Sequence, residues 1–205
     1  MLFTLALAAI AYLLGSCPWG LIIARVFCGI DPRKDGSRNT GATNVARLCG
    51  FGWGVAVLAC DIAKGTLPVL LAMWEGGSVF TVTIVGLAAV LGHVFSVFMG
   101  FKGGKAVATS IGVFIPLAFF PVLIASIICL AVIAISGFVS LGSLTLLTVL
   151  PIVLAYFGQY QWIPLALCLW AVVTWRHKEN IARLRAGKEK SWIKSRNKQQ
   201  ESKEN

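Results

Sequence analysis

Between Lys105 and Arg176 the chain runs for 70 consecutive residues without a formally charged side chain. The surface of a soluble domain cannot be built from such a stretch, because soluble domains contain about 25% charged residues. The whole chain of 205 residues is 58% hydrophobic and 13% charged, with a mean hydropathy of +0.83. Its richness in aromatic and aliphatic residues also excludes a disordered chain. We therefore predict an all-α polytopic integral membrane protein.

A helix needs about 20 mostly apolar residues to cross the hydrocarbon core of a bilayer. Three segments meet this requirement once each, at residues 1–24, 51–74 and 79–101. The first begins with no basic residue ahead of its apolar run, so we interpret it as a retained span and not as a signal peptide.

The number of crossings in the uncharged stretch follows from the placement of basic residues, which gather around residues 33–47, 102–105 and 176–198. Basic loops face the cytoplasm, so this stretch must cross the membrane an even number of times. Two crossings of about 35 residues would each be too long, which leaves four. Pro and Gly residues predict the intervening turns at 117–120, 136–142 and 157–161.

The chain is thus expected to form seven transmembrane helices, with the N-terminus out and the C-terminus in. Residues 1–187 make up the membrane domain, and residues 188–205 a polar basic cytoplasmic tail. The basic residues are explained by topology, so no nucleic-acid partner is expected. The six cysteines lie at least eleven residues apart without a CxxC pair, and neither a metal site nor a dense disulfide framework is predicted.

Three polar stretches converge on the cytoplasmic side under this topology. The first, GSRNTGATNVAR at residues 36–47, packs many hydroxyl and amide groups beside glycines that let the backbone turn. Such a segment can bind an anion, although composition alone also fits an ordinary hydrophilic loop.

The second stretch, GFKGGKAVAT at residues 100–109, combines glycines with two lysines ahead of a helix. Glycine amides, lysine charges and a helix N-terminus together favour phosphate binding. It is not a Walker A loop, because Ala106 stands where Ser or Thr is required. The alternative is an inside loop whose lysines only fix topology.

The third stretch, WRHKENIARLRAGKE at residues 175–189, places His177 and Asn180 three residues apart and therefore on one helix face. A basic amphipathic helix resting on anionic headgroups is the alternative interpretation. Inside the predicted spans, Asp61 and Lys64 are expected to form a structural ion pair. For His93, a structural hydrogen bond and a catalytic role both remain open.

Together these stretches resemble the bacterial acyl-phosphate:glycerol-3-phosphate acyltransferase family, PlsY. The shared patterns are GS-x-N-x-GATN-x-x-R at 36–47, GH-x-F and FKGGK-x-VAT at 92–109, and RH-x-x-NI-x-RL-x-x-G-x-E at 176–189. The resemblance includes DIAKG at 61–65 and spans nearly the whole chain. Arg38 and Ala106 depart from it, since glycine is often found at both positions.

The resemblance implies a multi-pass protein of the bacterial inner membrane with its active site on the cytoplasmic face. It implies acyl transfer from acyl phosphate to the sn-1 hydroxyl of glycerol 3-phosphate, which yields lysophosphatidate and inorganic phosphate and begins phospholipid synthesis. No cofactor is implied. The expected partners are the two substrates and membrane lipid, with functional coupling to the enzyme that forms acyl phosphate.

Carried over position by position, the resemblance implies catalytic roles for Ser37, Arg47, His177 and Asn180. Substrate-binding roles are implied for Asn39, Gly41, Thr43, Asn44, Lys102, Gly103, Gly104 and Lys105, with the Gly103 and Gly104 amides on phosphate. Glu189 is expected to be structural. The base that accepts the hydroxyl proton is left open between His177 and a substrate phosphate, with positioning favoured for His177.

Other function classes fit the pattern less well. Neither histidine begins an HxxxxD acyltransferase motif, since Phe98 and Ala182 stand at the aspartate positions. A transporter of a phosphorylated solute would need binding groups near the bilayer midplane, whereas these motifs lie at one face. A purely structural membrane component would leave all three polar stretches unexplained.

Overall fold

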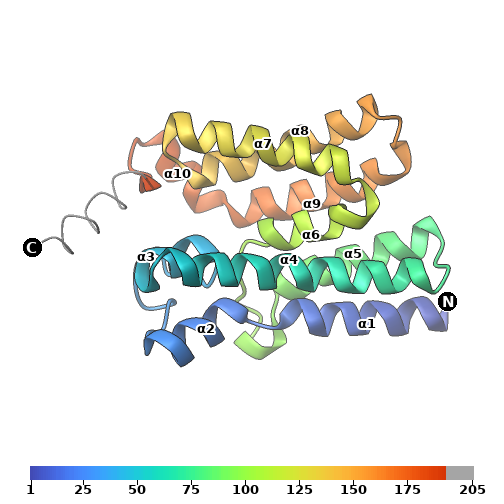
Figure 1. Cartoon of the computed structure of the whole chain (residues 1–205), viewed down its shortest axis with the longest axis horizontal. Coiled ribbons are helices and arrows are strands. Elements are labelled where there is room, and N and C mark those ends of the chain that lie inside the picture. Colours follow the sequence, from blue (N-terminus) through green and yellow to red (C-terminus); the bar gives the residue numbers. More distant parts are fainter. Residues whose placement is uncertain (193–205) are drawn as a thin grey trace, which may run out of the picture.

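A computed structural model describes residues 1–192, and this part of the chain contains helices and no strand (Figure 1). The α-helices are α1 (Leu2–Ser16), α2 (Trp19–Cys28), α3 (Ala42–Cys49), α4 (Phe51–Trp74), α5 (Val79–Val94), α6 (Val107–Leu117), α7 (Phe119–Ser136), α8 (Val139–Tyr156), α9 (Ile163–Arg176) and α10 (Lys178–Arg185). Two short 3₁₀ helices, Val97–Met99 and Tyr160–Trp162, complete them.

The first predicted span is longer than expected and broken. Pro18 has no amide hydrogen to continue the α1 ladder, so the chain restarts as α2, and the two helices together run over Leu2–Cys28. The Cys17 carbonyl at this break accepts a hydrogen bond from Lys64 on α4, at 2.9 Å. The break thus supplies a backbone acceptor within the span.

The predicted turns in the uncharged stretch are confirmed. Helices end and restart at Leu117–Phe119 and Ser136–Val139, within the segments expected at 117–120 and 136–142, and at Tyr156–Ile163, which contains the segment expected at 157–161. The protein is a multi-pass membrane protein, in which five described segments have the length and apolarity of spans: Leu2–Cys28, Phe51–Trp74, Val79–Met99, Phe119–Ser136 and Val139–Tyr156. The α6 and α9 helices are shorter, and the 11 residues of α6 rise only about 16 Å.

The helices form two groups that lie along the long axis of the molecule (Figure 1). α1 packs on α5 and α7 packs on α8, while α6 packs closely on α4. This last contact depends on glycine: a Cβ on Gly112 would lie 2.1 Å from the Ile62 carbonyl oxygen, and one on Gly65 would lie 2.3 Å from the Thr109 oxygen. Small residues let helices approach in this way inside a membrane, where van der Waals packing drives association.

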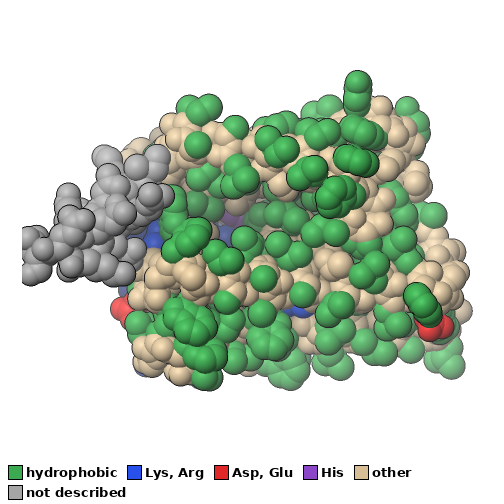
Figure 2. Space-filling view, viewed as in Figure 1, with side chains coloured by type: hydrophobic (Ala, Val, Ile, Leu, Met, Phe, Trp, Pro, Cys, Tyr) green, Lys and Arg blue, Asp and Glu red, His purple; other side chains and the backbone are tan. Residues whose placement is uncertain are grey.

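The surface of the bundle differs between its sides and one end. Apolar side chains are spread over the whole face shown in Figure 2, and most of the visible lysine and arginine side chains lie toward the end that carries α3 and α10. The opposite end carries the N-terminus and the α4–α5 connection (Figure 1). The fold therefore brings the polar stretches together at one end of an apolar body.

Candidate active site

The three polar stretches meet at the end of the bundle formed by α3 and α10. Lys105, from the second stretch, donates its Nζ hydrogen bond to Oδ1 of Asn180 in the third. Arg176 donates to the carbonyls of Gly103 and Gly104, at 2.7 and 3.1 Å. Arg47, from the first stretch, donates to the Lys190 carbonyl at 3.3 Å. The predicted gathering of the three stretches at one end of the helical body is confirmed.

Glu189 is the hub of this cluster. Its Oε1 accepts from Asn180 Nδ2 at 2.6 Å and from Ser140 Oγ at 2.8 Å, and its Oε2 accepts from Arg183 Nε at 2.7 Å. Burial alone would raise the pKa of Glu189, but these hydrogen bonds outweigh it and the pKa lies below the usual value. All the partners are side chains of the protein that donate to an ionised carboxylate.

Lys105 is a partly buried cation. Burial lowers its pKa to about 8, although the negative charge of Glu189 acts in the opposite direction. The ammonium is thus still mostly protonated at pH 7 and loses its charge as the pH rises through about 8. Its hydrogen bond orients it toward the third stretch.

His177 is nearly fully buried, at 2% exposure, in the joint between α9 and α10. Its Nδ1 lies 2.8 Å from the Val173 carbonyl oxygen, which can only accept, so Nδ1 carries the proton. Burial and the Lys105 charge lower the pKa of His177 to about 4. The imidazole is therefore neutral at pH 7, and its Nε2 atom offers a lone pair.

The glycines of the second stretch have partners other than those expected. The amides of Gly103 and Gly104 donate to the Val94 and His93 carbonyls, at 2.9 and 3.1 Å, so in this structure they are not directed at a phosphate site. A Cβ on Gly104 would lie 2.2 Å from Nε2 of His93. Glycine is thus needed here for contact with His93. Lys102 is exposed beside this turn.

Both departures from the family pattern have left-handed backbone conformations. Arg38 has φ +56° and Ala106 has φ +59°, and with Phe101 they are the non-glycine residues of positive φ among those described. Glycine adopts this region without strain, whereas a Cβ is unfavourable there. The chain keeps the turn geometry of a glycine while carrying a side chain.

Asn44 organises the first stretch from within. It is 1% exposed, its Oδ1 accepts from the Ser37 amide at 2.7 Å, and its Nδ2 donates to the carbonyls of Pro32, Asp35 and Asn39. All these groups belong to the loop, so Asn44 contacts its own chain and not an open site. The Gly41 amide is likewise held by Asn39 Oδ1 at 2.8 Å.

The other predicted residues of the first stretch are more accessible. The Ser37 side chain is exposed and Thr43 is partly exposed. Arg47 is partly buried on α3, with its guanidinium 5.8 Å from the ring centre of Trp192. Burial lowers the pKa of Arg47 and the charge of Glu189 raises it.

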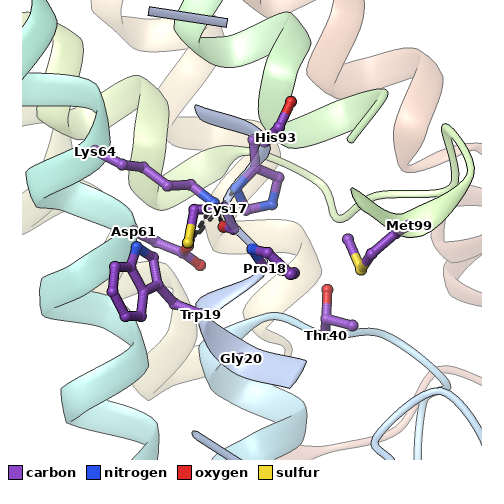
Figure 3. Close-up of a pocket in the computed structure, with 10 residues that line it drawn as sticks. Cys17, Pro18, Trp19, Gly20, Thr40, Asp61, Lys64, His93 and Met99 are labelled. Carbon is purple, nitrogen blue, oxygen red and sulfur yellow. Dashed lines mark hydrogen bonds and ion pairs between the residues drawn. The ribbon is translucent and has the colours of Figure 1, made fainter. Parts of the chain in front are cut away.

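Asp61 and Lys64 form the expected ion pair, at 2.8 Å, and are almost fully buried (Figure 3). His93 Nδ1 lies 3.8 Å from the same carboxylate oxygen and 3.0 Å from Thr109 Oγ1. The adjoining cavity encloses only about 10 Å³, about the least volume that admits one water. His93 thus contacts the second stretch at Gly104 and at Thr109.

Sequence reasoning gave no role to Ser140, Arg183, Lys190 or Trp192. Ser140 lies in the turn predicted at 136–142 on the same side of the membrane, and Arg183 lies inside the third stretch. Their positions in the sequence could therefore have indicated that both lie near the site. Residues 189–192, placed in the polar tail, contact the helical body, and the tail from residue 193 onward lies outside the described residues.

Comparison with known proteins gives one consistent result. Residues 5–187 match the family model described as glycerol-3-phosphate acyltransferase. A glycerol-3-phosphate acyltransferase from Desulfovibrio desulfuricans is 67% identical over 93% of this chain and 85% of its own length. Crystal structures of PlsY, an integral membrane glycerol 3-phosphate acyltransferase, superpose with TM-scores of 0.87 and 0.85 at 40% and 38% identity. The superpositions cover 92% and 94% of this chain and 94% and 97% of the PlsY chains, in the same order. The first PlsY structure is the glycerol 3-phosphate form and the second is the lysophosphatidic acid form.

Proposed function

We propose, since the chain belongs to the glycerol-3-phosphate acyltransferase family, that it acylates the sn-1 hydroxyl of glycerol 3-phosphate with an acyl group taken from acyl phosphate. The PlsY structures in glycerol 3-phosphate and lysophosphatidic acid forms support this acceptor and this product class. The observation that carries the proposal is the gathering of cations from all three polar stretches, joined by the Lys105–Asn180 hydrogen bond. Two phosphate-bearing substrates require such a basic site.

In the proposed reaction the sn-1 hydroxyl oxygen attacks the carbonyl carbon of the acyl phosphate. A new ester C–O bond forms and the C–O bond to phosphate breaks, so that lysophosphatidate and inorganic phosphate leave. An acyl phosphate is a mixed anhydride with a good leaving group, which makes a covalent enzyme intermediate unnecessary. Positioning two reactants contributes on the order of 7 kcal/mol, and a donor at the developing oxyanion adds ~3 kcal/mol.

The cations are assigned to the phosphates. Lys105 and Arg47 are charged and partly buried, so their electrostatic attraction to a phosphate is less screened than that of a surface lysine. Ser37 and Lys102 are exposed at the rim and are assigned to the outer part of the same site. Asn39 and Thr43 complete the first stretch. Asn44, Gly41, Gly103 and Gly104 support the site by holding its loops.

His177 is assigned to positioning of the acceptor hydroxyl. With its proton on Nδ1, the Nε2 lone pair accepts a hydrogen bond from that hydroxyl. A pKa of about 4 makes the imidazole a weak base at neutral pH, while the second pKa of a phosphate monoester, near 6, makes the substrate phosphate a stronger one. We therefore assign the proton to a substrate phosphate, and Asn180 to orientation of the reactants.

The proposal extends to topology and location. It includes seven spans, with α6 and α9 crossing as short helices, the N-terminus outside, and the site on the cytoplasmic face of the bacterial inner membrane. It also includes functional coupling to the enzyme that supplies acyl phosphate. The basic residues that gather near α3 and α10 support this orientation, because positive charge favours the cytoplasmic side (Figure 2).

The reaction is tested by incubating the purified protein with palmitoyl phosphate and glycerol 3-phosphate. We expect lysophosphatidate and inorganic phosphate in equal amounts, and no product when palmitoyl-coenzyme A replaces the acyl phosphate. Product formation from the thioester at an equal rate would contradict the choice of donor.

The topology is tested by labelling single cysteines placed at the exposed positions Lys34, Lys102 and Lys188 in a cysteine-free background. All three should react with a membrane-impermeant thiol reagent only from the cytoplasmic side. Lys102 is a better label position than Gly103, because a Cβ on Gly103 would lie 1.9 Å from the His93 carbonyl oxygen. Labelling from outside at any of the three would contradict the proposed orientation.

A further inference from the structure

The described end of the chain, residues 189–192, crosses the site and contacts three separate parts of it; we call this segment the C-terminal strap. Glu189 accepts from Asn180 and Arg183 on α10 and from Ser140 on α8. The Trp192 amide donates to the Gly137 carbonyl in the α7–α8 turn, at 2.8 Å. The strap is thus anchored on the half of the bundle that contains α8 and α10.

The same strap contacts the opposite half of the bundle, at the first polar stretch. Lys190 Nζ donates to the Gly36 carbonyl at 2.8 Å, and the Lys190 carbonyl accepts from Nη2 of Arg47 at 3.3 Å. These partners are more than 140 residues away along the chain. The strap therefore joins the α3 side of the site to the α8 and α10 side.

The contact between Trp192 and Arg47 affects the orientation of the Arg47 guanidinium as well as its distance from the strap. The guanidinium carbon lies 5.8 Å from the centre of the indole ring, within the range of a cation–π interaction. A guanidinium binds a phosphate through a planar fork of donors, so the plane in which it is held decides whether that fork meets the anion. The contact with the ring and the hydrogen bond to the Lys190 carbonyl both restrict how the guanidinium can turn.

We propose that Trp192 is a positioning residue that orients Arg47 toward a substrate phosphate. The inference rests on the proposed function, which assigns Arg47 to phosphate binding, and it deepens that function by including a residue beyond the segment 5–187 that matches the family model. The ligand group is a monosubstituted phosphate, supplied by the ester glycerol 3-phosphate or by the anhydride acyl phosphate. Trp192 itself does not contact the reacting atoms.

The test compares Trp192→Leu with Trp192→Phe in the full-length protein. Leucine keeps apolar bulk but has no ring, so KM for one phosphate substrate should rise about three- to tenfold with kcat changed less than twofold. Phenylalanine keeps a ring face and should restore KM to within about twofold of the wild type. Measuring KM for both substrates identifies the phosphate that Arg47 binds.

The control is Trp74→Leu, which makes the same substitution at an 87% exposed tryptophan at the end of α4. It should leave both kinetic constants unchanged. Equal KM values for wild type and Trp192→Leu would overturn the proposal. So would a fall in kcat with unchanged KM in both Trp192 variants, accompanied by a lower unfolding temperature, because that pattern indicates a purely structural role.

A binding measurement separates this inference from the proposed reaction. Glycerol 3-phosphate and palmitoyl phosphate, added separately, should each raise the unfolding temperature of the wild type in detergent. For at least one of them, Trp192→Leu should need a severalfold higher concentration for the same rise, and Trp192→Phe should not. If the wild type transfers no acyl group from acyl phosphate, the proposed donor fails, while this binding series still supports or overturns the role of Trp192.

Discussion

Two clusters of charged side chains lie in different parts of this molecule and differ in the balance between their positive and negative charges. The membrane cluster, Asp61, Lys64 and His93, is buried between α4 and α5 and contains one formal charge of each sign (Figure 3). The site cluster, Lys105, His177, Asn180 and Glu189, lies at the end of the bundle beside Arg47, Arg176 and Arg183. Cations outnumber carboxylates there.

The difference indicates in which part of the fold charged groups are paired within the protein and in which part they can bind a ligand. Lys64 donates to both Asp61 and the Cys17 carbonyl, so its charge is used within the protein, as is usual for ionisable groups inside a membrane. The site cluster has a lone pair on Nε2 of His177 and more cations than carboxylates, which the proposed function assigns to the acceptor hydroxyl and to the substrate phosphates, respectively. We expect the membrane cluster to control stability and the site cluster to control activity.

The largest expected effect is loss of activity in Lys105→Met. Removing a partly buried cation from a phosphate should lower kcat/KM about 10³-fold, equivalent to ~4 kcal/mol, with little change in unfolding temperature. Lys102→Met is the matched control and should lose less than tenfold, because Lys102 is exposed. Equal losses in the two variants would contradict the assignment of Lys105 to the centre of the site.

The reverse outcome is expected for Lys64→Met. The substitution leaves the Asp61 carboxylate buried without its cation, which should lower the free energy of unfolding by ~3 kcal/mol. The double variant Asp61→Leu/Lys64→Met removes both charges and should recover most of that loss. Thermal unfolding in detergent measures both. If the double variant is as unstable as the single one, the cluster contributes more than a mutual ion pair.

A smaller loss is expected at His177. His177→Ala should lower kcat about 10²-fold, and His177→Gln should recover part of it, because a glutamine carbonyl can accept the hydrogen bond that Nε2 accepts. The rate should still fall below about pH 6 in His177→Gln, through titration of the substrate phosphate. Disappearance of that acid limb would identify His177 as the base.

The pH dependence on the alkaline side should be milder still. Because the pKa of Lys105 is lowered to about 8, the cation is present below that pH and is lost as the pH rises through it. Therefore kcat/KM, which reports the free enzyme, should fall up to about tenfold per pH unit above pH 8. Lys105→Arg keeps its charge throughout this range, and its profile should stay flat to about pH 10. A limb at pH 8 in that variant would assign the titration to another group.

The smallest expected effect concerns backbone strain beside the site. Ala106 has φ +59°, so Ala106→Gly should raise the free energy of unfolding by about 1 kcal/mol. Ala108→Gly, two residues later inside α6, should lower it by about as much, because glycine costs conformational entropy in a helix. The same sign of change in both variants would exclude strain at Ala106 as the cause.

The sequence predicted the helix boundaries well because Pro and Gly act locally. The turns near residues 117, 136 and 157 follow from such residues. The break after Cys17 also has a local cause, Pro18, but it was not predicted. The ion pair of Asp61 and Lys64 was also predictable, since the two residues lie one helical turn apart. In the site, the convergence of three polar stretches followed from topology alone.

The partners within the site were not predictable, because they depend on atoms distant in the chain. Glycines at 103 and 104 indicate exposed amides when considered alone, yet those amides donate to Val94 and His93. Asn44 has the composition of a binding residue, yet its side-chain amide is used by its own loop. Local composition shows which hydrogen-bond donors and acceptors a segment has, but not the partners with which they bond in the folded protein.

The sequence by itself determined the membrane class, the family, the order of the helices and the gathering of the polar stretches at one end of the bundle, because hydropathy, charge, motifs and turn residues act over short distances. Only the tertiary structure decided which of those polar groups are used within the protein and which remain for a ligand. It placed Glu189 among Ser140, Asn180 and Arg183, fixed the proton of His177 on Nδ1, and set Trp192 against Arg47. The physical reason is that burial and hydrogen-bond pairing arise from packing between segments separated by up to 154 positions in the chain.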